Sequence, residues 1–270
     1  MDRKVAQIGN GFVGNALHRS FEQKGLETVI YDKYQKIGSI DAVFESDILF
    51  LCLPTPYVLN KGFDLSPIEE NLKILSEMNY AGLCVVKSTV EIGVTKALSK
   101  RYKLNIAHNP EFLTERTAYE DFHNQSHIVL GKSSESKEFS ELILLYKELY
   151  PNAKLSICTS DESEAMKIFC NNFYAAKVMI FNELFSLSEK TGINFERVKQ
   201  LMLENGWINP MHTSVPGPDG KFAYGGNCFV KDTHALVNQM QKLGSLSEVF
   251  EAVVSERNSL RSDMPNINEE

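Results

Sequence analysis

A cysteine that could act as a nucleophile stands in the stretch Tyr224-Gly225-Gly226-Asn227-Cys228-Phe229-Val230-Lys231-Asp232. The two glycines carry no Cβ, so the backbone before Cys228 can approach a bound molecule closely. A thiol attacks as its thiolate, and a nearby cation or the start of a helix favours that form. The other interpretation is a small buried apolar side chain where a loop meets a helix, which is the usual state of a free cysteine. The stretch alone leaves both interpretations open.

Two further groups of polar residues have spacings that suit catalysis. Lys167 and Asn171 are four residues apart in a stretch without Gly or Pro, so they share one face of a helix. Such a pair could stabilise an oxyanion in a cleft, or it could be plain surface. Thr55, Thr89 and Glu111 each come shortly after an apolar run that predicts a strand. In a parallel sheet these positions meet at the carboxyl edge, where ligands bind.

The first glycine-rich turn predicts a dinucleotide site. Gly9-Asn10-Gly11-Phe12-Val13-Gly14 follows a short apolar run over 4–8 and opens a helical pattern. These glycines make the tight turn and admit a pyrophosphate at the helix N-terminus. A second strand over 28–31 delivers Asp32, whose carboxylate would accept hydrogen bonds from the adenosine ribose. Because a 2′-phosphate would meet a like charge at Asp32, the pattern favours NAD over NADP.

Strand and helix patterns alternate through the first 158 residues. Further strands are expected over 47–53, 83–87, 104–107, 128–130 and 154–157, and helices over 66–78, 94–102 and 134–149. The alternation predicts an α/β fold, a Rossmann-like doubly wound parallel sheet with helices on both faces. Cys52, Cys84 and Cys158 lie within or at the ends of strands, where a structural role is expected.

From residue 159 the pattern becomes helical. Thr159-Ser160-Asp161-Glu162 is a capping-box sequence, and it opens a helix that runs without Gly or Pro to about Lys190. About 30 residues at 1.5 Å each give about 45 Å, a length typical of helices that bridge domains or form dimer interfaces. Other helices are expected over 194–205, after Cys228 and Asp232 to about 243, and over 247–261, followed by a frayed polar tail over 265–270. We predict two domains, 1–158 and 159–270, the second all-helical and built on the long helix.

Composition argues against several classes of function. The chain has 270 residues, a net charge of −7 and a sequence pI near 5.5, whereas nucleic-acid-binding domains usually carry a basic patch. No apolar run reaches the roughly 20 residues that span a bilayer, and the N-terminus has no signal-peptide pattern. Five widely spaced cysteines without a Cys-x-x-Cys pair indicate neither a disulfide framework nor a zinc site. We expect a cytoplasmic protein with no metal, no membrane partner and no nucleic-acid partner.

Taken together, these stretches resemble the UDP-glucose/GDP-mannose dehydrogenase family of NAD-dependent nucleotide-sugar dehydrogenases. Single pieces such as Lys87-Ser88-Thr89 are weak signals, but the order and spacing of the whole set are specific. The matching segments are 9–14, 52–56, 64–66, 87–90, 109–115 with Asp121-Phe122, 164–167 with Asn171, and 225–232.

The resemblance implies a four-electron oxidation of the C6 alcohol of a nucleotide sugar, most of all UDP-glucose to UDP-glucuronate, which feeds polysaccharide synthesis. Cys228 would trap the aldehyde-level intermediate as a thiohemiacetal. A second hydride transfer to NAD would leave a thioester, which water releases as the carboxylate. Lys167 and Asn171 would stabilise the oxyanion.

The resemblance also implies the remaining site residues. Asp232 and Thr89 would hold the hydrolytic water, and Glu111 would be the best candidate for its general base. Glu115 would lie nearer the nicotinamide, and which glutamate acts as base stays open. The cofactor-binding residues implied are Gly9, Asn10, Gly11, Phe12, Val13, Gly14, Asp32, Pro54, Thr55, Thr89 and Glu115. The substrate-binding residues implied are Glu111, Phe112, Leu113, Lys167, Asn171, Tyr224 and Gly225. The long helix over 160–190 would form a homodimer.

Two departures from the family pattern leave alternatives open. Residues 33–46 are a shorter segment than the family usually has between its second and third strands. The family's further α/β domain, which binds the substrate nucleotide, is expected to begin where this sequence stops. The sequence would then be a compact form lacking that domain, a fragment, or one part of a split enzyme with a separate nucleotide-binding chain.

Two other functions compete with this one. A two-electron β-hydroxyacid dehydrogenase also pairs a Rossmann domain with a helical domain and uses a Lys-x-x-x-Asn pair. That family does not need Cys228, Asp232, Glu111 or Glu115, so their joint presence speaks against it. The other alternative is a non-catalytic NAD-binding or dimerisation module.

Overall fold

The structure, a computed structural model, describes residues 3–268, and this part of the chain divides into two compact units. The first unit comprises the residues up to Thr55 together with Asp64–Lys167, and the second comprises Pro56–Phe63 and the residues from Ile168 onward. The domain boundary at residue 158 stays a prediction, because the division into compact units does not show which segments fold independently. No helix within residues 3–268 combines the length and the apolar character needed to cross a membrane.

A seven-stranded sheet forms the centre of the first unit, in the order β2-β1-β3-β6-β7-β8-β9. Its strands are β1 (Val5–Ile8), β2 (Thr28–Tyr31), β3 (Ile48–Leu51), β6 (Leu83–Val86), β7 (Asn105–His108), β8 (His127–Lys132) and β9 (Lys154–Thr159). The strand order reverses at β1, which pairs with β2 on one side and with β3 on the other. Such a reversal is the topological switch point of a doubly wound sheet, where ligands bind beyond the carboxyl ends of the strands.

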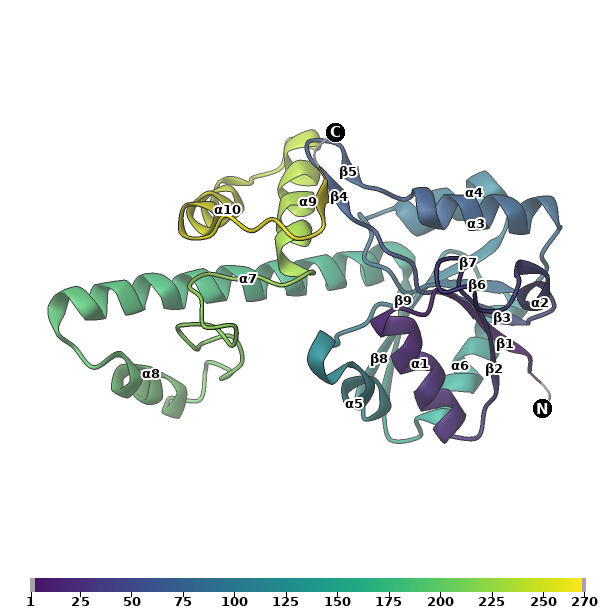
Figure 1. The fold of residues 1–270 in the computed structure, drawn as a ribbon, viewed down its shortest axis with the longest axis horizontal. Coiled ribbons are helices and arrows are strands. Elements are labelled where there is room, and N and C mark those ends of the chain that lie inside the picture. Colours follow the sequence, from purple (N-terminus) through teal and green to yellow (C-terminus); the bar gives the residue numbers. More distant parts are fainter. Residues whose placement is uncertain (1–2, 269–270) are drawn as a thin grey trace. The chain divides into compact units, whose positions relative to one another are not determined.

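Helices cover both faces of this sheet (Figure 1). One face carries α1 (Phe12–Gln23), α5 (Ala118–His123) and α6 (Lys137–Leu149), and the other carries α2 (Ile40–Phe44), α3 (Ser66–Glu77) and α4 (Val94–Tyr102). Each helix turns an apolar stripe to the sheet. Leu17 and Phe21 of α1 are fully buried on the first face, and Leu72 and Leu75 of α3 on the second. The predicted Rossmann-like α/β fold is confirmed.

The sheet is not wholly parallel, which corrects the sequence-based prediction. β8 runs antiparallel to β7, with Lys132 opposite Ala107 and Gly131 opposite His108, while β8 and β9 are parallel. The chain between β7 and β8 contains only a 3₁₀ turn and the six residues of α5. A helix of that length rises about 9 Å, too little to carry the chain back along a strand of about 20 Å. β8 therefore starts on the carboxyl side of β7.

The second unit is built mainly from helices. Besides the part of α7 (Ser160–Thr191) that follows Lys167, it contains α8 (Phe195–Glu204), α9 (Phe229–Lys242) and α10 (Glu248–Leu260). Ala175 and Met179 of α7 form its core with Tyr224 and with Val230 of α9. The prediction of a helical region built on one long helix is confirmed.

The start of α7 follows the predicted capping box. The Thr159 hydroxyl accepts the backbone N–H of Glu162 at 3.3 Å, and the Glu162 carboxylate accepts the backbone N–H of Thr159 at 2.8 Å. This reciprocal pair satisfies two N–H groups that a helix start leaves without partners. It fixes the start of a helix of 32 residues.

A small three-stranded sheet in the second unit was not predicted. β4 (Tyr57–Val58) and β5 (Gly62–Phe63) form a hairpin, and β10 (Ile267–Asn268) pairs in parallel with β4. The backbone N–H groups of Tyr57 and Leu59 donate to the carbonyls of Asn266 and Asn268. The expectation of a frayed tail is therefore wrong for 265–268, because the edge of the hairpin supplies hydrogen-bond partners. Residues 269–270 lie outside the described residues.

Candidate active site

The glycine-rich turn after β1 brings the backbone of three segments, β1, β3 and α1, close together. Gly9 has a φ of 93°, and a Cβ there would lie 2.3 Å from the carbonyl oxygen of Cys52. A Cβ on Gly14 would lie 2.1 Å from the carbonyl oxygen of Gly9. Any residue larger than glycine at either position would push β1, β3 and α1 apart.

The start of α1 fits a phosphate group. Its first N–H groups, from Phe12, Val13 and Gly14, have no partner within the helix and carry partial positive charge. The N-cap residue Gly11 has no side chain to accept from them, and the first turn holds no acidic residue. A Cβ on Gly11 would have open space around it. The dinucleotide pyrophosphate expected here would accept these hydrogen bonds.

Asp32 follows β2 and lies buried beside the glycine-rich turn. Its Oδ2 accepts the N–H of Asn10 at 2.7 Å, and its Oδ1 accepts the N–H groups of Tyr34 and Gln35 at 2.9 and 2.8 Å. These bonds fix the carboxylate in one orientation. Among residues 3–268, Oδ2 makes one further, long contact, 3.5 Å from Nε2 of Gln35, so it can accept a hydroxyl of the adenosine ribose.

The loops after β3 and β6 meet at the predicted edge. The Thr55 hydroxyl donates to the carbonyl of Thr89 at 2.8 Å, and the Ser88 hydroxyl donates to the carbonyl of Leu53 at 2.5 Å. Thr55 and Thr89 are both buried, whereas Pro54 is exposed. Their predicted contacts with the cofactor stay predictions.

Glu111 and Lys167 form a buried ion pair in the first unit. Lys167 Nζ lies 3.3 Å from Glu111 Oε1 and donates to the Glu111 carbonyl at 2.5 Å. Glu111 Oε2 accepts the N–H of Leu113 at 2.6 Å, and Nζ lies 4.9 Å from the ring centre of Phe112. The two side chains are only 8% and 4% exposed. Because a buried ion pair often adds no net stability compared with apolar residues, its presence favours a chemical role.

Glu115 has a different setting. It opens the 3₁₀ turn Glu115–Thr117 and is exposed. Asp121 holds this turn, since its carboxylate accepts the N–H of Thr114 and the hydroxyl of Thr117, both at 2.8 Å. The two glutamates that the sequence could not distinguish thus differ in burial.

Lys87, which stands in the family-like segment 87–90 but was given no role from the sequence, is buried. Its Nζ donates to Asn109 Oδ1 at 2.8 Å, and the same oxygen accepts the Tyr146 hydroxyl at 2.5 Å. Burial lowers the pKa of Lys87 to about 8, an effect opposed by Cys52 and Glu111. Lysine is rarely buried, and no pattern in one sequence marks such a position.

Asp232 is fully buried in the second unit, where two side chains bind its carboxylate. The Asn171 amide donates to Oδ2 at 2.6 Å, and Lys231 Nζ donates to Oδ1 at 2.6 Å. The Asn172 amide donates to the Asp232 carbonyl at 3.1 Å. The structure thus brings the predicted residues Asn171 and Asp232 together. It adds Lys231, whose only signal in the sequence was its place next to the aspartate.

Cys228 is the N-cap of α9, and its carbonyl accepts the N–H of Asp232 at 3.1 Å. The thiol is half-buried at the start of this helix. Tyr224 lies in the core with its hydroxyl donating to Thr233 at 3.1 Å. A substrate could therefore contact Tyr224 through its backbone and not through its side chain. The contact of Tyr224 and Gly225 with substrate stays a prediction.

Within residues 3–268 no group of three or more His, Cys, Asp or Glu side chains could hold a metal ion. The chemistry of the described residues is that of a dinucleotide turn, two buried charge pairs and a thiol at a helix start.

Two models of one protein family match the chain. The NAD binding domain of the UDP-glucose/GDP-mannose dehydrogenase family matches residues 35–150, and the central domain of the same family matches residues 161–259. The chain belongs to this family. Its cofactor is NAD, in agreement with the prediction and with the fit of the turn, α1 and Asp32 to a dinucleotide.

Individual members of the family are similar over most of this chain. UDP-glucose 6-dehydrogenase of Campylobacter jejuni is 31% identical over 268 residues, which cover 96% of this chain and 64% of that protein. The Rhizobium meliloti protein of the same name is 32% identical over 297 residues, covering 93% of this chain and 67% of the relative. This chain therefore spans about two thirds of the length of these curated relatives.

Similarity in structure supports the fold. A UDP-glucose dehydrogenase from Pyrobaculum islandicum has a TM-score of 0.85 at 23% identity, covering 95% of this chain and 68% of that one. At this identity the likeness establishes the fold and not the substrate.

Proposed function

We propose that this protein oxidises the C6 alcohol of a nucleotide sugar, UDP-glucose in the first place, to the carboxylate through a thioester on Cys228. The observation that carries the proposal is the start of α9. It presents Cys228 one turn ahead of a buried aspartate, Asp232, which is bound by Asn171 and Lys231. A two-electron dehydrogenase has no use for a thiol there. Relatives with the name UDP-glucose 6-dehydrogenase support the choice of substrate.

Each residue has a role that follows from its chemistry. NAD, when bound, takes up the hydride that leaves the substrate carbon. The Cys228 thiolate adds to the aldehyde carbon, so the oxygen becomes negative, and the donors Lys167 and Asn171 stabilise that charge. Loss of a second hydride from this adduct leaves a thioester, which water cleaves to the carboxylate and the free thiol.

Glu111 is the residue we propose as general base for the water. Its carboxylate lies against Lys167, and a base must accept a proton while bound within hydrogen-bond reach of the water. Glu115, exposed on its turn, is proposed to contact the cofactor instead, and Thr89 and Asp232 are proposed to hold the water.

The test is the ratio of cofactor reduced to acid formed. Purified protein given UDP-glucose and NAD is expected to yield two NADH for each sugar acid, because the alcohol loses four electrons. NADH is read by absorbance and the acid by mass spectrometry. One NADH per turnover with an aldehyde or keto product would instead support the β-hydroxyacid class. No NADH with UDP-glucose, GDP-mannose and UDP-N-acetylhexosamines would support a non-catalytic module or a requirement for a separate nucleotide-binding chain.

We further propose that α7 forms a homodimer interface. Phe169, Phe173, Ile180 and Leu187 form a stripe on this helix, and each is more than half exposed. An apolar stripe of this size usually marks an interface, and the same stripe on a second copy would cover it in a twofold contact.

Changing Phe173 to Glu is expected to convert a dimer into a monomer at micromolar concentration, because it places a charge in the contact. Sedimentation velocity measures the change. The matched control is Tyr34→Glu, which alters an aromatic residue of 88% exposure outside α7 and should leave the mass unchanged. A wild-type protein that is already monomeric at high concentration would exclude the interface.

A further inference from the structure

The Gly225 backbone lies directly against the guanidinium of Arg261. A Cβ on Gly225 would lie 2.4 Å from Nη2 of Arg261 and 2.6 Å from its Cζ and Nη1. These distances are far shorter than van der Waals contact. The end of an arginine can normally move away at little cost, so what matters is whether this guanidinium is free to move.

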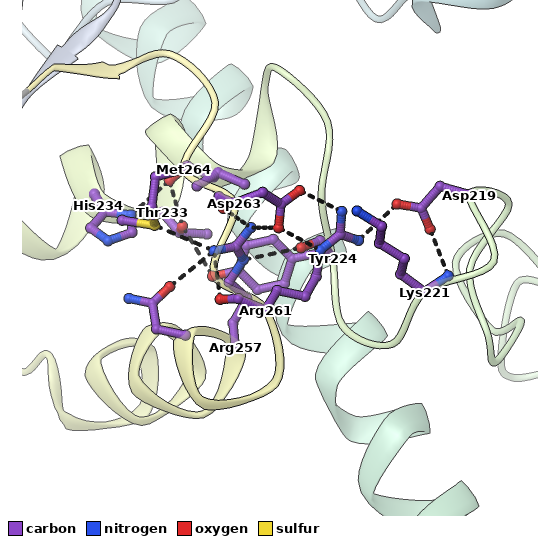
Figure 2. Close-up of polar contacts among 11 residues, drawn as sticks. Asp219, Lys221, Tyr224, Thr233, His234, Arg257, Arg261, Asp263 and Met264 are labelled. Carbon is purple, nitrogen blue, oxygen red and sulfur yellow. Dashed lines mark hydrogen bonds and ion pairs between the residues drawn. The ribbon is translucent and has the colours of Figure 1, made fainter.

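Two carboxylates hold the Arg261 guanidinium in place. Asp263 accepts from Nε at 2.9 Å and from Nη2 at 2.7 Å, and Asp219 accepts from Nη1 at 2.8 Å (Figure 2). The pairing of a planar fork with a carboxylate is strong and directional. It lowers the pKa of Asp263 below its usual range, mainly through the hydrogen bond from Arg261. The guanidinium is therefore fixed beside Gly225.

Arg257, one turn earlier in α10, holds the preceding residue. It is fully buried, and its Nε donates to the carbonyl of Tyr224 at 3.2 Å. Its Nη2 lies 3.1 Å from Oδ1 of Asp263, the oxygen that also accepts from Arg261 (Figure 2). Asp263 thus links the two arginines, and we call Arg257, Arg261 and Asp263 the arginine clamp.

The segment after the clamp makes one more contact with the same loop. The Asn266 amide donates to the carbonyl of Asn227 at 3.0 Å. Tyr224, Gly225 and Asn227 are thus each held by residues between 257 and 266. Cys228 is the next residue along the chain.

We propose that the arginine clamp is a positioning device for the cysteine loop, with Arg261 setting where the Gly225-Gly226-Asn227 backbone places the Cys228 thiol. The proposal deepens the proposed function, on which it rests, because a thiol must lie within about 3.5 Å of the carbon it attacks. The clamp acts through the backbone before the thiol: Arg257 binds the Tyr224 carbonyl, and Arg261 lies against Gly225.

The experiment is a double-mutant cycle at Gly225 and Arg261. Gly225→Ala and Arg261→Ala are each expected to lower kcat by about 10- to 100-fold, because a misplacement of about 1 Å has effects of that size, while KM for NAD stays unchanged. In the double variant the alanine Cβ meets no guanidinium. Its loss should therefore be no larger than that of Arg261→Ala alone. The proposal would be overturned if the kcat losses of the two single variants multiplied in the double variant. An Arg261→Ala kcat within about twofold of wild type would also overturn it.

A readout that does not depend on dehydrogenase activity separates the clamp from the proposed function. Iodoacetamide labelling, located by peptide mass spectrometry, should modify Cys228 at least about threefold faster in Arg261→Ala, because a loosened loop opens more often. Buried Cys84 should stay unmodified in every variant, which shows that the fold is intact. If the wild type oxidises no nucleotide sugar, the proposed function fails while the labelling cycle still tests the clamp. Unchanged labelling of Cys228 would overturn it.

Two further variants complete the design. Arg197→Ala removes an exposed arginine of α8 that contacts Gln200, and neither kcat nor labelling should change. Arg261→Lys keeps the charge but loses the planar fork. It should lie between wild type and Arg261→Ala in both measurements, and it replaces the alanine variant if that variant does not fold. A lysine variant that equals wild type in both would show that charge alone suffices and would overturn the positioning role of the fork.

Discussion

Replacing Cys228 by serine is expected to stop formation of the sugar acid while the protein still binds NAD. A serine hydroxyl at the start of α9 stays protonated at neutral pH, whereas a thiol there has a thiolate form that can attack. Removing a covalent nucleophile typically lowers kcat by roughly 10³- to 10⁶-fold. The fold should not change, because serine is close to cysteine in size and is a favoured residue at the N-cap position that Cys228 occupies in α9. Acid formation is followed by mass spectrometry and NAD binding by calorimetry.

The matched control is Cys170→Ser, which changes another half-buried cysteine, on α7. This variant should form acid at the wild-type rate. If Cys228→Ser also forms acid at the wild-type rate, the thioester route is wrong, and water must attack without a covalent intermediate. Labelling the wild type with iodoacetamide before the assay is an independent check, since it should stop acid formation in proportion to the Cys228 modified.

The sequence was sufficient where local chemistry decides the structure. The capping box at Thr159 and Glu162 forms both of its predicted hydrogen bonds, because its geometry depends on residues three apart. The glycine-rich turn was readable for the same reason. Gly9 and Gly14 sit where any Cβ would meet a backbone carbonyl, so the sequence has to carry glycine there.

The sequence was insufficient where contacts between distant segments determine the structure. β10 forms because residues 266–268 find the edge of β4, about two hundred residues earlier in the chain. The hairpin itself was missed because its strands have only two residues each, too few to show an alternating pattern. Asn60 and Gly62, both with positive φ, were the available signal. The direction of β8 depended on the shortness of α5, which no apolar pattern displays.

In the candidate site, too, the sequence predicted the residues but not their partners. The candidate residues came from motif order, whereas the hydrogen bond between Asn171 and Asp232 was not predicted. The partner of each charged group could not be read, since burial of Lys87, Lys167 and Lys231 depends on packing of the whole chain. The sequence around a lysine does not show whether its side chain is exposed to solvent or paired with a carboxylate.

Replacing Lys167 by methionine is expected to lower both activity and stability. Activity should fall by about 10²- to 10³-fold in kcat, the usual effect of removing one oxyanion donor. Stability should fall by about 3–5 kcal/mol, because Glu111 would keep a buried charge without its partner. Urea unfolding followed by circular dichroism measures the second effect, and NADH formation measures the first.

The double variant Lys167→Met with Glu111→Gln separates these two effects. Neutral glutamine leaves no unpaired buried charge, so most of the lost stability should return, since a buried pair can be replaced by neutral groups at little cost. Activity should not return, because both the oxyanion donor and the proposed base are gone. Glu27→Gln is the matched control: it removes an exposed carboxylate and should leave the urea midpoint at the wild-type value. A Lys167→Met protein as stable as wild type would contradict the buried ion pair, and a double variant with wild-type kcat would remove both residues from the mechanism.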